Sequence, residues 1–209
     1  MGRLYAAIAD VSGADVVVDS SKQVAAALLA RSAPGVEVRL IHLVRSPLGV
    51  AYSWTKHVSR ADLGGQEMRR RRAWRTALRW RADVALFERL GRTTPRLPVR
   101  YEDFVSAADS TTAAMVEFAA SPSAAGPAGP AGRAGRVAAA LDFVGPSWVE
   151  LAPDHSVWGN PMRNDRGRAP LKLDDAWRSD LPASQRKIVS FLTWPTAARL
   201  GYDQNDHVK

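Results

Sequence analysis

Residues 39–54 read RLIHLVRSPLGVAYSW, and this stretch contains the clearest transition between two patterns in the chain. Residues 38–44 (VRLIHLV) are rich in β-branched and large apolar residues, which is typical of a buried strand. A short turn ending in Pro47 follows, and proline is favoured at the first position of a helix. We therefore expect a strand over residues 38–44 and a helix over residues 48–58.

The segments on both sides repeat this alternation of strand and helix. Residues 15–19 (DVVVD) form a short β-branched run ahead of a helical stretch over residues 22–31, and residues 97–101 are expected to form a third strand. A long basic helix over residues 66–90 separates the second and third strands, with apolar residues at helical spacing. Such alternation predicts an α/β layered fold with a parallel sheet.

The rest of the chain is predicted to be mostly helical. Further helices are expected over residues 4–11, 105–120, 136–144 and 184–200. Gly13 is positioned to end the first of these, and Pro195 is expected to kink or split the last. Residues 121–135, rich in Ala, Gly and Pro, are interpreted as a flexible insertion, and residues 154–168 as a polar loop.

The composition limits the class of protein. A chain of 209 residues, 46% of them hydrophobic, can bury one core, so we expect a single domain over residues 1–209. There are no cysteines, which excludes disulfides and thiolate metal sites. No apolar run approaches the ~20 residues needed to cross a bilayer, and no signal peptide is visible, so we expect a cytoplasmic protein without a membrane partner. The net charge of +8 suggests an anionic partner, which could be a nucleic acid, a membrane surface or a nucleotide phosphate. The alternative is that the abundance of arginine and alanine reflects a GC-rich coding bias.

The position of Arg45 indicates a phosphate site. In an open parallel sheet, ligands bind beyond the C-terminal ends of the strands, where helix N-termini offer free N–H groups and a favourable dipole. Arg45 is predicted at such an end, and its planar guanidinium can hold a phosphate through two N–H groups. Ser53, about two turns along the helix, can add a hydroxyl. In the alternative interpretation Arg45 pairs with a surface carboxylate and Ser53 has no ligand.

These residues resemble a motif of the bacterial sulfotransferases that use 3′-phosphoadenosine 5′-phosphosulfate (PAPS). In that family a strand ending in Arg, followed by a helix with Ser at the eighth position, binds the 3′-phosphate of the donor, as LVRSPLGVAYS would with Arg45 and Ser53. Most such members have Asp where Ser46 stands. Further stretches match the family in the same order: VVVDSSK at 16–22, VRYEDF at 99–104, HSVWGNPMR at 155–163 and LKLDDAW at 171–177. The resemblance covers residues 4–202 and implies a P-loop-NTPase-like three-layer fold.

The resemblance also implies a function and a set of site residues. PAPS would be the donor substrate, without a metal, and a sulfuryl group would pass to a hydroxyl or amine of a small-molecule or glycan acceptor. Arg45, Ser53 and Arg163 would contact the 3′-phosphate. Ser20 and Ser21 would lie in the turn beside the sulfuryl group. The family varies most in the parts that shape the acceptor pocket, so the acceptor stays open.

Lys22 and Asp19 are the candidate catalytic residues. At the end of a strand, the ammonium of Lys22 can lie near a transferring sulfuryl group, and the carboxylate of Asp19 can accept a proton from an acceptor hydroxyl. In the alternative interpretation Asp19 and Ser20 cap the following helix and Lys22 is solvated.

One motif of the family is absent from the sequence. The family begins with a strand and a loop resembling R-S-G-T-T, whose backbone N–H groups hold the 5′-phosphosulfate and stabilise the charge on the leaving phosphate. No glycine of this chain lies in a comparable strand, loop and helix order followed by a basic residue and Ser or Thr. We therefore expect an N-terminally truncated member, without the first strand and phosphate loop and with impaired activity. The alternative is a non-catalytic nucleotide- or polyanion-binding remnant.

The remaining polar residues indicate no second site. The four histidines lack the spacing of metal ligands. For His155 the resemblance adds a nucleotide or acceptor role, and the alternative is a hydrogen bond within its loop. The basic run over residues 69–72 is interpreted as a solvated helix face. No helix-turn-helix, zinc-finger or RNA-binding aromatic motif is present, so a nucleic-acid partner is not expected.

Overall fold

Two parallel strands form the centre of the computed structural model, which describes residues 1–57, 59–60, 65–67, 69–121, 141–152 and 165–202. Strand β1 (Leu40–Val44) pairs along its length with strand β4 (Arg96–Arg100). The chain crosses between them through helices α3 (Pro47–Thr55) and α4 (Ala73–Leu90), because parallel strands cannot be joined by a tight turn. The predicted α/β class with a parallel sheet is confirmed at this level.

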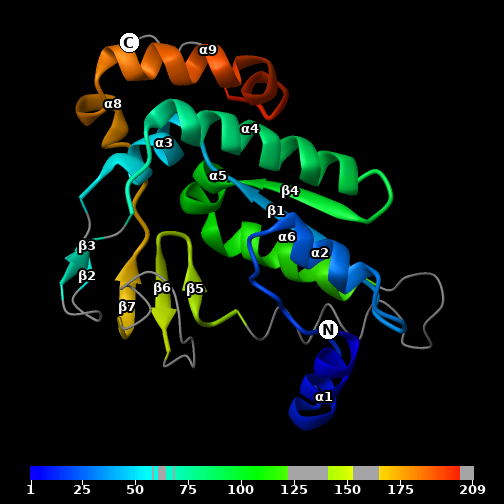
Figure 1. Ribbon diagram of the computed structural model, residues 1–209. Helices are drawn as coiled ribbons and strands as arrows, with labels where there is room; N and C mark the ends of the chain where they lie inside the picture. The colour runs from blue at the N-terminus through cyan, green and yellow to red at the C-terminus, as the bar shows by residue number, and fades with distance from the viewer. Residues whose placement is uncertain (58, 61–64, 68, 122–140, 153–164, 203–209) are drawn as a thin grey trace.

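Helices lie on both faces of the two-stranded sheet (Figure 1). Successive residues of β1 alternate between buried and exposed, as expected when a strand turns one face to a core. On the buried face, Val44 packs against Trp80 of α4 and Ala197 of α9 (Ala183–Arg199). Helix α6 (Ala108–Ala120) contacts β4 and lies on the opposite side of the strands from α4.

A second cluster of buried residues surrounds α3. Leu48 and Ala51 of α3 pack against Ala77 of α4. The same cluster includes Trp177 of α8 (Trp177–Asp180) and, after it in the chain, Leu181 and Val189. Leu48 and Ala51 are fully buried, so α3 is held firmly between α4, α8 and α9. This packing fixes the helix that follows Arg45.

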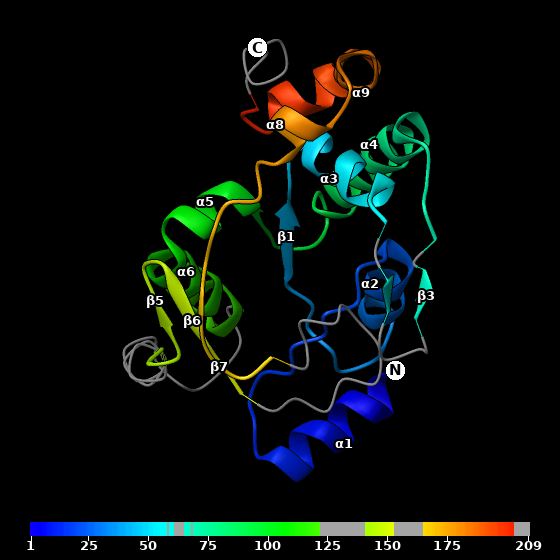
Figure 2. The same cartoon turned by 90° about the vertical axis from the view of Figure 1, so that its left-hand side faces the viewer.

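The remaining elements lie around this centre. They are α1 (Gly2–Ser12), α2 (Val24–Arg31), β2 (Ser59–Arg60), β3 (Gln66–Glu67), α5 (Tyr101–Ser106), β5 (Val144–Gly145), β6 (Trp148–Leu151) and β7 (Gly167–Pro170). β5, β6 and β7 form an antiparallel sheet that the sequence analysis did not predict. Helix α1 ends at Gly13, whose φ of 65° is left-handed as predicted for a C-cap. None of its residues is buried, and it lies at the end of the molecule opposite α8 and α9 (Figure 2).

Two of the predicted strand and helix assignments are wrong. Residues 15–19 form no strand, because no strand in the described ranges pairs with them, and Val18 is 85% exposed. Of the predicted helix over residues 136–144, the structure describes residues 141–144. Residues 141–143 are not helical, and Val144 begins β5. In both places the secondary structure depends on which other segments the residues pack against or pair with, and not on the local apolar pattern alone.

Helix boundaries also differ from the predictions. The basic helix begins at Ala73 rather than residue 66, since β3 and an irregular segment precede it. Helix α9 is not split, and it continues through Pro195. The missing N–H of Pro195 deprives the carbonyl of Phe191 of its helical partner. The predicted flexible insertion lies outside the described residues beyond Ser121.

Candidate functional site

Arg45 directly follows β1, at the edge of the sheet where both parallel strands end. Helix α3 begins two residues later with Pro47 in its first turn, so its N-terminus lies at the same edge. The N–H of Ser46 donates to Glu102 Oε1 at 2.9 Å. A carboxylate here is favoured by the positive end of the helix dipole, so this edge of the sheet already holds one anionic group.

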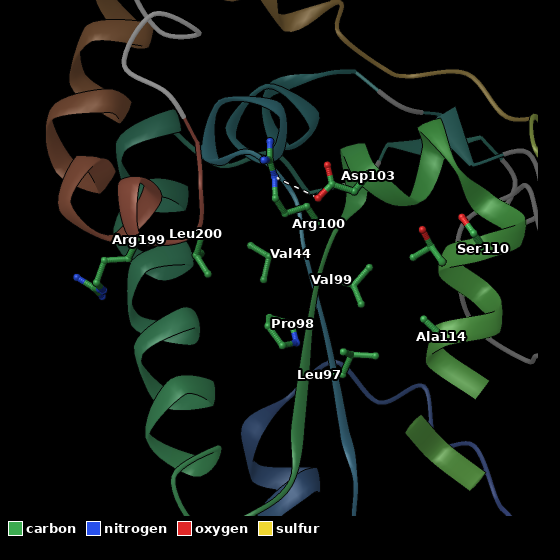
Figure 3. A pocket seen from close by; sticks show the side chains of 11 residues that line it. Val44, Leu97, Pro98, Val99, Arg100, Asp103, Ser110, Ala114, Arg199 and Leu200 are labelled. Carbon is green, nitrogen blue, oxygen red and sulfur yellow. Dashed lines mark ion pairs between the residues drawn. The ribbon is translucent and has the colours of Figure 1, made fainter. Parts of the chain in front are cut away.

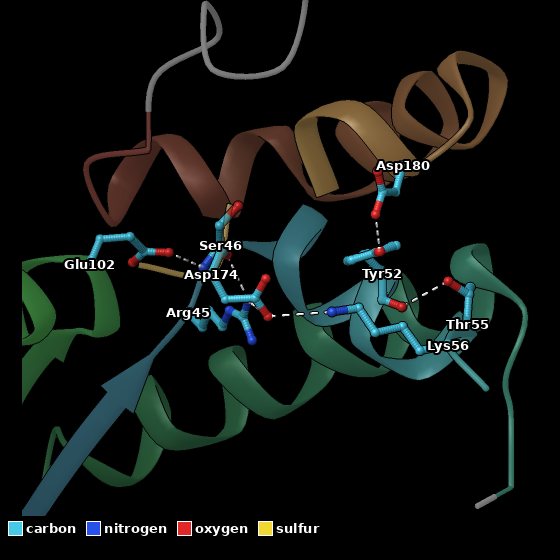
Figure 4. A network of polar contacts seen from close by, with 8 residues as sticks. All are labelled: Arg45, Ser46, Tyr52, Thr55, Lys56, Glu102, Asp174 and Asp180. Atoms are coloured by element: carbon cyan, nitrogen blue, oxygen red, sulfur yellow. Dashed lines mark hydrogen bonds and ion pairs between the residues drawn. The ribbon is translucent and has the colours of Figure 1, made fainter. Parts of the chain in front are cut away.

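The side chain of Arg45 lies against the first turn of α3 and binds Asp174 (Figure 4). Its Nη2 donates to the backbone oxygen of Asp174 at 2.9 Å and lies 3.0 Å from Asp174 Oδ2. The guanidinium carbon lies 4.9 Å from the centre of the Tyr101 ring, which adds a cation–π contact. A Cβ at Gly49 would lie 2.9 Å from Arg45 Nε, so the glycine is what allows this close approach.

Lys56 and Ser53 extend the site along α3. Residues four positions apart share a helix face, so Gly49 and Ser53 lie on one face of α3, and Lys56 is the C-cap residue that follows the helix. Lys56 Nζ is 3.6 Å from the same Asp174 Oδ2 that Arg45 contacts. Ser53 is exposed, and its hydroxyl has no hydrogen-bond partner among the described residues. The site therefore places two cations at a single carboxylate, while the described contacts do not join the Ser53 hydroxyl to it.

The ionisation of Asp174 follows from these neighbours. Burial raises the pKa of the Asp174 carboxyl, but the hydrogen bond and charge of Arg45, with the charge of Lys56, bring its pKa below the ordinary value of 3.8. Asp174 is therefore charged at neutral pH, and it offsets one of the two positive charges. The alternative interpretation of Arg45 predicted an ion pair of this kind with a carboxylate. The carboxylate belongs to Asp174, which lies far from Arg45 in the sequence.

Buried hydrogen bonds fix the backbone on both sides of Arg45. Trp80 Nε1–H donates to the Arg45 carbonyl oxygen at 3.0 Å. The hydroxyl of Tyr202 lies 3.0 Å from the Val44 carbonyl oxygen and 2.9 Å from Glu102 Oε2. Burial, together with the charge of Glu102, raises the pKa of Tyr202, so its hydroxyl stays protonated as a donor. The guanidinium of Arg45 thus projects from a rigid strand end.

A further polar contact joins α3 to α8. The hydroxyl of Tyr52 donates to Asp180, and this hydrogen bond raises the pKa of Tyr52 to about 12. Lys56 Nζ lies 4.3 Å from the centre of the Tyr52 ring. These contacts hold the Lys56 end of the site against the segment that carries Asp174 (Figure 4).

The predicted catalytic residues are not brought to Arg45. Asp19 accepts hydrogen bonds from the hydroxyl of Tyr5 and, at 2.7 Å, from the N–H of Ser21. Ser20 and Lys22 are exposed. No contact within the described part of the chain joins residues 19–22 to Arg45. Figure 2 draws the connection between α1 and α2 below β1, whereas the arrowhead of β1 points up toward α3.

The alternative role of these residues as helix caps is also absent. Helix α2 begins at Val24 after Gln23, and no side chain caps its N-terminus. Asp19 instead hydrogen-bonds within its own turn and to α1. The predicted ligand Arg163 and the candidate His155 lie outside the described residues.

Two cavities border this site without including Arg45, Ser53 or Lys56, because Val44 lines one and Thr55 lines the other. One, of about 490 Å³, runs beside β4 with Leu97 and Val99 in its apolar wall and Arg100 at its rim, near Asp103 (Figure 3). The other, of about 360 Å³, lies at the start of α4 beside Trp74. None of the predicted site residues that the structure describes lines either cavity.

Sequence reasoning missed Lys56 and Asp174. Lys56 had a readable signal, since it follows Ser53 by three residues on the predicted helix. Asp174 had none, because its contact with Arg45 joins positions 129 residues apart. In the described ranges, no cluster of three or more His, Asp or Glu side chains is arranged to hold a metal ion. None of the helices found there combines the length and apolar character needed to span a membrane.

The comparisons with known proteins leave the family open. No protein-family model matches the chain, and no curated protein or solved structure matches it either.

Proposed function

We propose that Arg45, Ser53 and Lys56 bind a nucleotide phosphate, and that the protein is a sulfotransferase-like protein whose donor is PAPS. The observation that carries the proposal is the carboxylate of Asp174 held between two cations at the C-terminal edge of the parallel strands. A phosphate at the same place would accept two guanidinium N–H bonds and the hydroxyl of Ser53.

The 3′-phosphate of PAPS is the proposed ligand group because of the spacing of these residues. Arg45 directly follows a strand of a parallel pair, and Ser53 stands eight residues later on the helix that follows. This order is the motif by which the chain resembles the sulfotransferase family, and a P-loop-NTPase-like fold is part of the same proposal. Lys56 adds a second cation, which suits the two charges of a phosphate monoester.

Calorimetric titration with 3′,5′-ADP tests the binding site. A charge-assisted hydrogen bond contributes roughly 1.5 to 3 kcal/mol, so Arg45→Ala should weaken binding by about ten- to a hundredfold. Arg79→Ala is the matched control, because Arg79 pairs with Asp83 on the outer side of α4. 5′-AMP, which lacks the 3′-phosphate, should bind wild type and Arg45→Ala alike. Equal affinity of the two proteins for 3′,5′-ADP would remove Arg45 from the site.

The second candidate function is nucleotide or polyanion binding without catalysis. It is favoured by the position of Lys22 and Asp19, which make no described contact with the Arg45 site. Binding energy without stabilisation of the charge that grows in the transition state does not lower the barrier. Labelled PAPS with a panel of phenols, sugars and alcohols separates the two functions. Transfer of label to any acceptor supports the enzyme, whereas 3′,5′-ADP binding without transfer supports the non-catalytic protein.

A further inference from the structure

The carboxylate of Asp174 occupies the place at which the proposed phosphate would bind. Its Oδ2 lies 3.0 Å from Arg45 Nη2 and 3.6 Å from Lys56 Nζ, and both of these groups are cationic. The backbone oxygen of Asp174 takes a further guanidinium N–H at 2.9 Å. A phosphate held by two guanidinium nitrogens, one of them Nη2, would meet these two oxygens, because both lie on Nη2.

We propose that Asp174 is an internal competitor for the anion, and that residues 171–176 must leave Arg45 before a ligand phosphate can bind. This inference rests on the proposed function of the Arg45 site. It adds a form of regulation to the proposed site. The Asp174 carboxylate and the ligand phosphate cannot bind Arg45 and Lys56 at the same time.

The segment carrying Asp174 is built so that its middle can move while its ends stay attached. At one end, the N–H of Leu171 donates to the Ser147 carbonyl oxygen at 2.8 Å, directly after β7. At the other end, Trp177 is buried in the cluster around α3. Between them Leu173 is 48% exposed, and the side chain of Asp174 is 37% exposed. Few buried contacts resist local opening of such a segment.

With such competition, the apparent dissociation constant equals the intrinsic dissociation constant divided by the fraction of molecules in which Arg45 is free of Asp174. When a binding-competent state makes up about a tenth of the population, the apparent dissociation constant rises about tenfold. Both partners of the Arg45–Asp174 pair are partly exposed, so we expect an effect of this modest size rather than complete closure of the site.

Asp174→Asn is the variant that tests the competition. It removes the charge and keeps a side-chain oxygen to accept the N–H of Ala176, which contacts the Asp174 carboxyl. Asp175→Asn is the matched control, because it makes the same change one residue away on an exposed side chain. We expect Asp174→Asn to bind 3′,5′-ADP about five- to tenfold more tightly than wild type, and Asp175→Asn to bind as wild type does.

Amide hydrogen exchange in the wild-type protein supplies a second readout. Saturating 3′,5′-ADP or inorganic phosphate should speed exchange in residues 171–176 while leaving β1 unchanged. Equal or weaker binding by Asp174→Asn, or slower exchange in that segment, would overturn the competition while leaving the nucleotide site in place.

The same titrations separate this inference from the proposed function. If Asp174→Asn binds inorganic phosphate more tightly than wild type but no variant binds 3′,5′-ADP, the competition stands and the nucleotide function fails. If neither anion binds Asp174→Asn, in which Arg45 has lost its competitor, both the site and the competition are wrong.

Discussion

His42 should make the folding of this protein sensitive to mild acid. It lies in the middle of β1 with 8% of its surface exposed, and the centre of its ring lies 4.8 Å from that of the tilted Phe87 ring. Arg96 Nη1 lies 3.1 Å from His42 Nδ1. Because a guanidinium has only donors, Nδ1 must accept, which requires a neutral imidazole with its proton on Nε2. Burial and the charge of Arg96, against a smaller opposing effect of Glu88, lower the pKa of His42 from 6.5 to about 4.

The size of the effect follows from this lowered pKa. Between pH 6.5 and 4 the unfolded chain binds a proton at His42 that the folded chain does not bind, so stability falls as the pH falls. At about 1.4 kcal/mol for each pKa unit, the full contribution is on the order of 3 kcal/mol. About 2 kcal/mol of it should be lost between pH 7.5 and 5.0, before most carboxylates begin to titrate.

Urea unfolding at pH 7.5, 6.5, 5.8 and 5.0 measures this loss directly. His42→Gln should flatten the dependence, because the amide oxygen can still accept from Arg96 and the side chain does not titrate. His57→Gln removes an exposed histidine and serves as the matched control. If wild type and His42→Gln lose the same free energy of unfolding over this range, the buried neutral histidine is not the cause.

Two further predictions concern stability and exposed apolar surface. Tyr202→Phe removes the hydroxyl that contacts Val44 and Glu102. In urea titration, this variant should have a free energy of unfolding about 1 to 2 kcal/mol lower than that of wild type. A loss below about 0.5 kcal/mol would show that the hydroxyl adds little to stability. The side chains of Ile41 and Leu43 are 41% and 53% exposed on a strand that pairs on one side only within the described residues, so the folded protein should bind the dye ANS and tend to associate. Leu43→Lys should reduce both, and unchanged dye fluorescence in this variant would place the exposed apolar surface elsewhere.

The sequence correctly predicted those helices and strands whose signals lie within a few neighbouring residues. The apolar run ending at Val44, the proline that opens α3 and the glycine after α1 each act within a few residues, so their structural meaning does not depend on distant partners. Residues 15–19 had an equally good strand pattern and failed, because a strand forms only where another backbone offers hydrogen bonds. The antiparallel sheet of β5 to β7 was missed for the converse reason, since its short strands carry little pattern and depend on pairing.

The same division holds at the candidate site. The sequence by itself determined that Arg45 lies at the end of a strand and that Ser53 follows on the next helix, because strand ends and helix periodicity are local properties. Only the tertiary structure decided that the guanidinium meets Asp174, which lies 129 residues away and arrives through the connection between β7 and α8. It also decided that residues 19–22 lie apart from that charge cluster. A charged side chain takes whichever opposite charge the packed chain brings within reach, and that choice is made by the packing of α3, α8 and α9 rather than by any neighbouring residue.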